Sequence, residues 1–421
     1  MSIRSTYLLI LLAIAISVFS WRLMVREADT LPYFSDEVAN VQATTSFFSN
    51  GNYVNDRYGL VYSSGIAVTW PSAIGWNLSR NMLGSRLSCA FFSWIFAVLL
   101  GFYFFRDNGY AGSESLATSV CLWAVTVTSP LALPYWYGFM YNLGELNSAV
   151  LIGFGLLLIA RHPFLSVFMF GVAVWHGKYL YFPFILVILF ADLYVQKLSV
   201  KRIMVRAGWY FIIFLLPLLI WMGWLCLNLD VTTMKQWLLT QFGWLDQMQG
   251  RHSLLPSART SLSTLWERLS SPDLEWAGYS KGTKMKDLLF SLGAMVITAI
   301  GIFAVKAKKL RISDRQIWLS SMAAVIVGIY SIWYFFIHQY MWQRHFQPAI
   351  YIGFGLFVFW GVKWVKNRAA DLRPLFCAAA VLLLTIQVVQ GVKYPFLQSQ
   401  LTYARSCTDL YGAQCEPLDQ K

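Results

Sequence analysis

Apolar segments close to bilayer-spanning length recur along this 421-residue chain and leave few folds open to it. A membrane helix needs about 20 predominantly apolar residues to cross the hydrocarbon core. Hydrophobic residues make up 57% of the sequence and charged residues only 13%, which is not the composition of a soluble domain. A transmembrane β-barrel would instead show short segments of alternating polarity. The sequence therefore predicts an all-α polytopic membrane protein.

Eleven segments are expected to span the membrane, and residues 1–391 are expected to form one transmembrane unit. The first segment lacks a signal-peptide cleavage site, so it is expected to remain as an anchor. Two long polar loops, 27–81 and 229–285, interrupt the series, and a short tail, 392–421, follows it. The expected spans are 6–25, 83–105, 115–133, 145–160, 163–176, 179–195, 207–228, 287–305, 317–337, 348–362 and 374–391.

Basic residues gather in alternate short connections between these spans. They are Arg106, Arg161, Lys197, Lys201, Arg202, Arg206, Lys306, Lys308, Lys309, Arg311, Arg315, Lys363, Lys366, Arg368 and Arg373. The positive-inside rule assigns this side to the cytoplasm. The N-terminus is then cytoplasmic, and both long loops and the tail lie on the outer, periplasmic or lumenal, face. A bacterial inner membrane is the expected location.

The net charge of +13 is explained mainly by the basic residues that set this topology. No basic tract stands apart from the helices, so we expect membrane lipids and no nucleic acid as partners. Cys407 and Cys415 lie close together in the tail, where they are expected to close a small disulfide loop if the tail is outside the cytoplasm. The five histidines show no HExxH or similar spacing. No cofactor is assigned, and a divalent metal stays an open alternative.

Asp36 and Glu37 follow the first span at the start of the first outer loop. Within this loop an amphipathic pattern predicts a helix in the membrane interface. Its apolar face consists of Val38, Val41, Thr45 and Phe48, and its polar face of Asp36, Glu37, Asn40 and Thr44. A carboxylate near the membrane surface can act as general base on an acceptor hydroxyl or amine. The alternative is structural, because Ser35 can cap the helix and first-turn acids favour its dipole.

Basic residues on the outer side form a second group of candidates. Lys178 lies in a tight turn between two apolar segments, and Arg344 lies between two late ones. Either side chain can hold a lipid phosphate, or it can extend to the interface without a ligand. Arg251 and Arg86 are weaker candidates, for which a surface position is the alternative. Glu145 enters a span from the outer side, where an ionisable residue indicates function or a favourable dipole contact.

The order of these features resembles the membrane glycosyltransferases with the C-type (GT-C) fold. Within them it is most similar to the protein O-mannosyltransferase and lipid A aminoarabinose transferase group, a glycosyltransferase 39-like superfamily. The resemblance covers most of the chain and rests on four motifs. They are Asp36-Glu37, Asn50-Gly51-Asn52-Tyr53-Val54 with the later Trp70-Pro71, Gly171-Val172-Ala173-Val174-Trp175-His176-Gly177-Lys178, and Gln343-Arg344-His345-Phe346-Gln347-Pro348.

The resemblance implies inverting transfer of a sugar from a polyprenyl-phosphate donor to a saccharide, lipid or protein acceptor on the outer face. Asp36 would activate the acceptor with Glu37 as its neighbour, and Lys178 and Arg344 would hold the donor phosphate. Arg251 and Arg86 are the further expected phosphate contacts. The expected substrate contacts are Glu145, His252, His345, Tyr58 and Trp70.

One departure from the family concerns its Lys-Pro-Pro motif in the first outer loop. Here the corresponding residues are Val68-Thr69-Trp70-Pro71-Ser72, without the lysine. Phosphate binding would then depend on the other basic residues.

Two other functions compete with sugar transfer from a polyprenyl phosphate. A polysaccharide polymerase or ligase would use a polyprenyl-diphosphate donor, and the early acidic pair argues against it. A lipid-glycan flippase or transporter predicts charged residues or broken helices at mid-membrane depth. The charges of this chain gather instead at the outer ends of the expected spans.

Overall fold

The computed structural model describes residues 3–30, 35–51, 65–107, 111–128, 145–177, 181–196, 198–232, 234–235, 283–307, 310, 312–337 and 346–367. These residues form twelve α-helices and two short π-helical turns, with no strand among them. Four helices are long and apolar enough to cross a membrane: Met82–Asp107, Val200–Asn228, Asp287–Lys306 and Gln316–Phe335. The expectation of an all-α, multi-pass membrane protein is confirmed at this level.

The helices follow the expected spans closely. Every expected span except 374–391, which lies outside the described residues, overlaps one helix. The helices are α1 (Ile3–Thr30), α4 (Met82–Asp107), α5 (Gly112–Thr128), α7 (Glu145–Leu158), α8 (Pro163–Val172), α9 (Phe182–Val195), α10 (Val200–Asn228), α13 (Thr283–Lys306), α14 (Asp314–Ile332) and α15 (Gln347–Asn367). The tail cysteines also lie outside the described residues.

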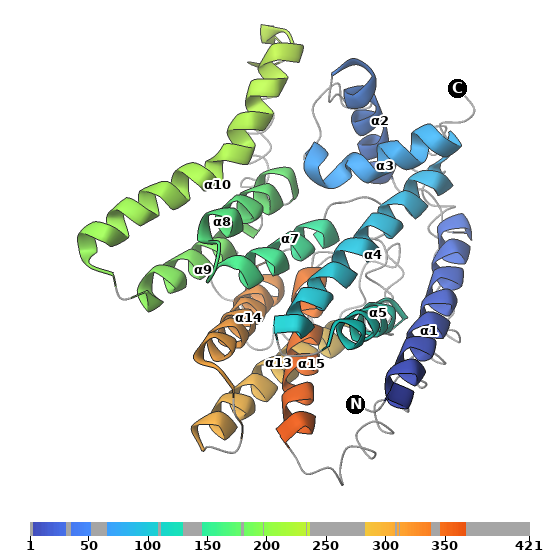
Figure 1. Cartoon of the computed structure of the whole chain (residues 1–421). Helices are drawn as coiled ribbons and strands as arrows, with labels where there is room; N and C mark the ends of the chain where they lie inside the picture. The colour runs from blue at the N-terminus through green and yellow to red at the C-terminus, as the bar shows by residue number, and fades with distance from the viewer. Residues whose placement is uncertain are drawn as a thin grey trace.

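Two shorter helices, α2 (Ser35–Asn50) and α3 (Ile66–Ser79), come from the first long polar loop. Figure 1 shows them together beside the start of α4, and α3 packs against both α2 and α4. We call the end of the molecule where α4 and α7 begin the loop end. We call the opposite end the basic end, because Arg106 lies in the last turn of α4 and Lys306 in the last turn of α13.

An aromatic core lies between α7, α8, α9, α14 and α15. The Phe184 and Tyr330 rings are 4.6 Å apart, as are the Tyr334 and Phe346 rings. Such pairs add specific ring contacts to the burial of apolar area. Two of the helices that enclose this core end in π-helical turns: η2 (Ala173–Gly177) after α8 and η5 (Trp333–Ile337) after α14. Single π-helical turns are rare and frequently mark functional sites.

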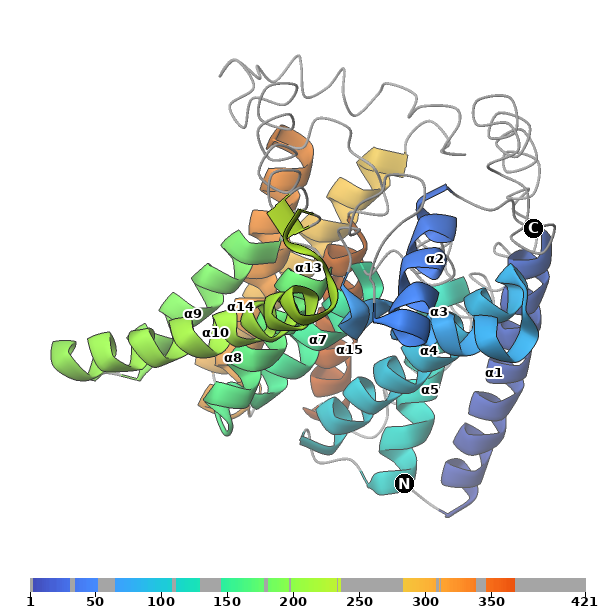
Figure 2. The same cartoon turned by 90° about the horizontal axis from the view of Figure 1, so that it is seen from above.

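Helix α10 leans away from the other helices on one side of the molecule, as both views show (Figures 1 and 2). Its exposed side chains include Trp209, Phe211 and Leu219, which are 54%, 64% and 55% exposed. A large exposed apolar surface on a long helix is typical of contact with lipid. The helix also contains Pro217, which removes one backbone hydrogen bond from its interior.

Candidate functional site

The polar face of α2 is turned toward the protein. Asn40 and Thr44 are fully buried, and the Thr44 hydroxyl donates to the Asn40 carbonyl at 2.6 Å. The expected apolar face is divided, because Val41 is 1% exposed whereas Phe48, further along, is 53% exposed. The backbone places Asp36 in the first turn of α2, one turn before Asn40. The acidic pair therefore begins the same helical face that is buried further along.

Helices α3, α4 and α7 are joined at the loop end by one partly buried amide. The Asn147 side chain donates to the Val68 carbonyl of α3 at 2.9 Å and accepts from the Ser93 hydroxyl of α4 at 2.8 Å. Asn147 lies two residues after Glu145, the first residue of α7. This amide fixes the start of α7, and hence the backbone position of Glu145, against α3 and α4.

Arg86 does not lie on the surface, which was the alternative to phosphate binding considered from the sequence. Its side chain is only 1% exposed, and Nη1 donates to the Ala28 carbonyl near the end of α1 at 2.7 Å. A buried guanidinium is costly unless its donors find partners. Arg86 therefore joins the ends of α1 and α4 close to the start of the first loop. Its assignment to a donor phosphate stays a prediction.

Trp70 of α3 packs against α4 through its ring. Its centroid lies 4.5 Å from that of Phe92, with the two planes at 61°. The side chain remains partly exposed. This contact fixes the indole at the loop end, where the sequence places it as a substrate contact.

The π-helical turn η2 brings the segment before Lys178 against α3 and α10. The Gly65 amide donates to the His176 carbonyl at 2.7 Å, and the His176 Nε2 atom lies 3.3 Å from the Pro217 carbonyl. A Cβ atom on Gly65 would clash with the His176 imidazole, so a larger residue there would require the ring to shift. The Trp175 Nε1 group also donates to the Phe214 carbonyl at 2.9 Å. These contacts hold the chain up to Gly177, immediately before Lys178.

The second π-helical turn lies against the segment that follows Arg344 and His345. Phe346 is fully buried and packs on Tyr334 and Phe335, with ring centroids 4.6 and 5.4 Å away. The residues before Lys178, Ala173 and Val174, belong to the same core cluster. The two segments predicted to bind phosphate are thus each anchored next to a π-helical turn on one shared core.

Several predicted site residues lie outside the described part of the chain. They are Lys178, Arg344, Arg251, His252, His345 and Tyr58. For Asp36, Glu37 and Glu145 the structure describes the backbone. Among the described residues, no group of three or more histidine, cysteine, aspartate or glutamate side chains could hold a metal ion.

Some polar residues at the loop end were not singled out from the sequence as site residues: Asn40, His176 and Asp287, which are buried, and Asn147, which is partly buried. Asp287 is fully buried near the start of α13. Each lies within about two turns of the loop end of its helix. A polar residue one turn inside an apolar segment is the signal that could have identified them, because burial there is costly without a partner.

Replacing Asn147 with leucine is expected to lower the free energy of unfolding by about 1–3 kcal/mol. The Val68 carbonyl loses its side-chain donor and the Ser93 hydroxyl loses its acceptor. The thermal midpoint of the detergent-solubilised protein measures the change. Ser93→Ala removes only one of the two bonds and should cost about 1 kcal/mol. If Asn147→Leu were as stable as the wild type, the amide would not join these helices.

Comparisons with protein-family models, with curated proteins and with solved structures found no match for this chain.

Proposed function

We propose that this protein transfers a sugar from a polyprenyl-phosphate donor to an acceptor at its loop end, on the outer face of the membrane. The observation that carries the proposal is the position of Asp36 and Glu37 at the start of the buried polar face of α2. The helical register places Asp36 one turn before Asn40 and about two turns before Thr44. The positive-inside rule assigns that end to the outer face.

The reaction requires one base and a site for a phosphate. The acceptor hydroxyl gives its proton to the Asp36 carboxylate as its oxygen attacks the anomeric carbon. The bond from that carbon to the phosphate oxygen breaks, and its electron pair leaves on polyprenyl phosphate. Attack from the face opposite the leaving group inverts the configuration. The leaving group is already a stable anion, so a single carboxylate is sufficient.

Basic residues would stabilise the charge that develops on the departing phosphate. We assign this role to Lys178 and Arg344. The anchoring of their neighbours Gly177 and Phe346 beside the two π-helical turns supports the assignment. A backbone held firmly by buried contacts positions a charge more accurately than a solvated loop does.

The class of donor provides the experiment. Purified protein in liposomes is incubated with membranes as the acceptor source and with labelled sugar on one of three carriers: a polyprenyl phosphate, a polyprenyl diphosphate or a nucleoside diphosphate. Transfer from the polyprenyl phosphate alone is the expected result for at least one sugar in a panel of hexoses and pentoses. Transfer from the nucleotide alone, or from the diphosphate alone, would contradict the proposal.

A further inference from the structure

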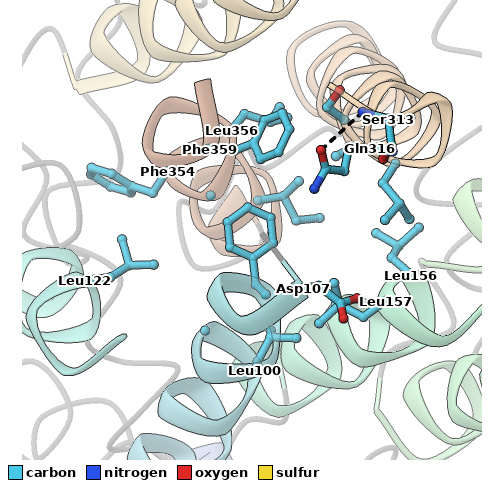
Figure 3. Close-up of a pocket in the computed structure, with 18 of the residues that line it drawn as sticks. Leu100, Asp107, Leu122, Leu156, Leu157, Ser313, Gln316, Phe354, Leu356 and Phe359 are labelled. Carbon is cyan, nitrogen blue, oxygen red and sulfur yellow. Dashed lines mark hydrogen bonds between the residues drawn. The ribbon is translucent and has the colours of Figure 1, made fainter. Parts of the chain in front are cut away.

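A cavity of about 340 Å³ lies at the basic end, far along α4 and α7 from the candidate site. It is lined by α4, α5 and α7 on one side and by α14 and α15 on the other (Figure 3). Its apolar lining includes Leu100, Leu156, Ala323, Leu356 and Phe359. Its volume falls in the range of small-molecule sites. An apolar lining favours an apolar occupant over water, which needs several polar partners.

The polar residues of the lining come from the helix ends at the basic end. Arg161 follows α7 and forms an ion pair with Asp107 of α4 at 3.4 Å. The Arg161 side chain is still 60% exposed, which leaves much of its guanidinium accessible. Ser313 and Gln316, at the start of α14, are held by reciprocal side-chain to backbone bonds of 3.3 and 3.4 Å. The cavity therefore combines an apolar interior with a polar rim.

The segments that adjoin the polar lining residues in the sequence are rich in basic residues. Residues 106–107, 161 and 306–315 contain seven basic residues and two acidic ones: Arg106, Arg161, Lys306, Lys308, Lys309, Arg311 and Arg315 against Asp107 and Asp314. Basic segments next to membrane helices attract anionic lipid headgroups, by about 1 kcal/mol for each basic residue near the surface. Arg161 is the basic residue of the described lining that can complement an anionic headgroup, and further basic residues flank the lining residues Asp107 and Ser313 in the sequence.

We propose that the cavity binds an acyl chain of an anionic phospholipid from the leaflet at the basic end, with the headgroup beside Arg161. Each methylene that enters an apolar site contributes about 0.8 kcal/mol. The lipid would fill the space between the α4, α5, α7 group and the α14, α15 pair. This inference does not depend on the sugar-transfer proposal.

A pair of glycines on α15 allows a matched test. A Cβ atom on Gly355, which lines the cavity, would meet no heavy atom within 4 Å. Gly355→Leu therefore extends a side chain into the cavity without a clash at its base. Gly361 lies on the same helix, outside the lining, and its Cβ atom would also meet nothing within 4 Å. Gly361→Leu thus makes the same chemical change away from the cavity.

Native mass spectrometry of delipidated protein, titrated with dioleoyl phosphatidylglycerol or dioleoyl phosphatidylcholine, measures binding. The wild type is expected to prefer phosphatidylglycerol. Gly355→Leu should weaken its binding by about tenfold or more, the equivalent of roughly 1.4 kcal/mol, and Gly361→Leu should not. Arg161→Gln should reduce the preference by about fivefold, whereas Arg202→Gln, an exposed change on α10, should leave it unchanged.

Three results would overturn the proposal. Equal binding by Gly355→Leu and the wild type would place the lipid elsewhere. Equal binding of the two lipids by the wild type would remove the role of the anionic headgroup. A disulfide cross-link between Gly355→Cys and a cysteine introduced in residues 374–391, formed in the presence of saturating phosphatidylglycerol, would show that the chain itself occupies the cavity.

Discussion

Replacing Asp36 with asparagine is expected to lower sugar transfer by about 10²–10⁴-fold, the contribution of a positioned general base. Asparagine has the shape of aspartate but cannot accept the acceptor's proton. Membrane insertion and the thermal midpoint should change little, because the loss of one first-turn charge costs only about 0.3–1 kcal/mol. The rate of transfer from a polyprenyl-phosphate sugar into membranes, measured at equal protein concentration, checks the prediction.

Glu37→Gln separates this role from simple stabilisation of α2. Asp36 and Glu37 occupy the same first turn, so both contribute similarly to the helix dipole. If the pair served only to stabilise α2, the two variants would lose similar, small amounts of stability and activity. A loss in transfer that is at least tenfold larger for Asp36→Asn supports its assignment as the base. Full activity in that variant would contradict the assignment.

Replacing Gly75 with leucine is expected to cause the largest loss of stability, at least about 3 kcal/mol of unfolding free energy. Helices α3 and α4 approach so closely that a Cβ atom on Gly75 would clash with the Gly84 carbonyl oxygen. A backbone oxygen cannot rotate away as a side chain can, so the helices must separate. Their separation also disturbs the Val68 carbonyl that Asn147 binds. Thermal unfolding in detergent measures the loss.

Gly223 provides the control for that substitution. It lies inside α10, and a Cβ atom there would meet nothing within 4 Å. Gly223→Leu also replaces the poorer helix former and should leave stability unchanged within about 0.5 kcal/mol or raise it. If both leucine variants were equally destabilised, the effect would not depend on the close approach of α3 and α4, and this explanation would be wrong.

The lengths of the apolar segments predict the helices of this fold well, but their ends less well. The segment expected at 207–228 belongs to a helix that begins at Val200. Lys201 and Arg202 are exposed in its first turn. A search for apolar residues excludes these charged positions, although the helix includes them. The segments at 163–176 and 317–337 end in π-helical turns. Composition does not reveal these turns, because the same residues can continue an α-helix.

The candidate site depends on contacts between distant parts of the chain, which one sequence does not reveal. The pattern of α2 identifies two faces, but an interfacial helix and a helix packed on protein share that pattern. Burial of Asn40 and Thr44 distinguishes them. The hydrogen bond from Arg86 to the Ala28 carbonyl joins residues that are 58 positions apart in the sequence. The bond from Asn147 to the Val68 carbonyl joins residues that are 79 positions apart. The residue types were visible in the sequence, and their partners were not.

The fate of the bond between sugar and phosphate tests the central claim most directly. Liposomes containing the protein are supplied with a doubly labelled polyprenyl-phosphate sugar and an acceptor membrane fraction. The account predicts one free polyprenyl phosphate for each sugar transferred, with inverted configuration in the product, and neither product from Asp36→Asn. Movement of the intact labelled lipid across the bilayer, with no bond broken and no acceptor required, would contradict it and indicate a flippase.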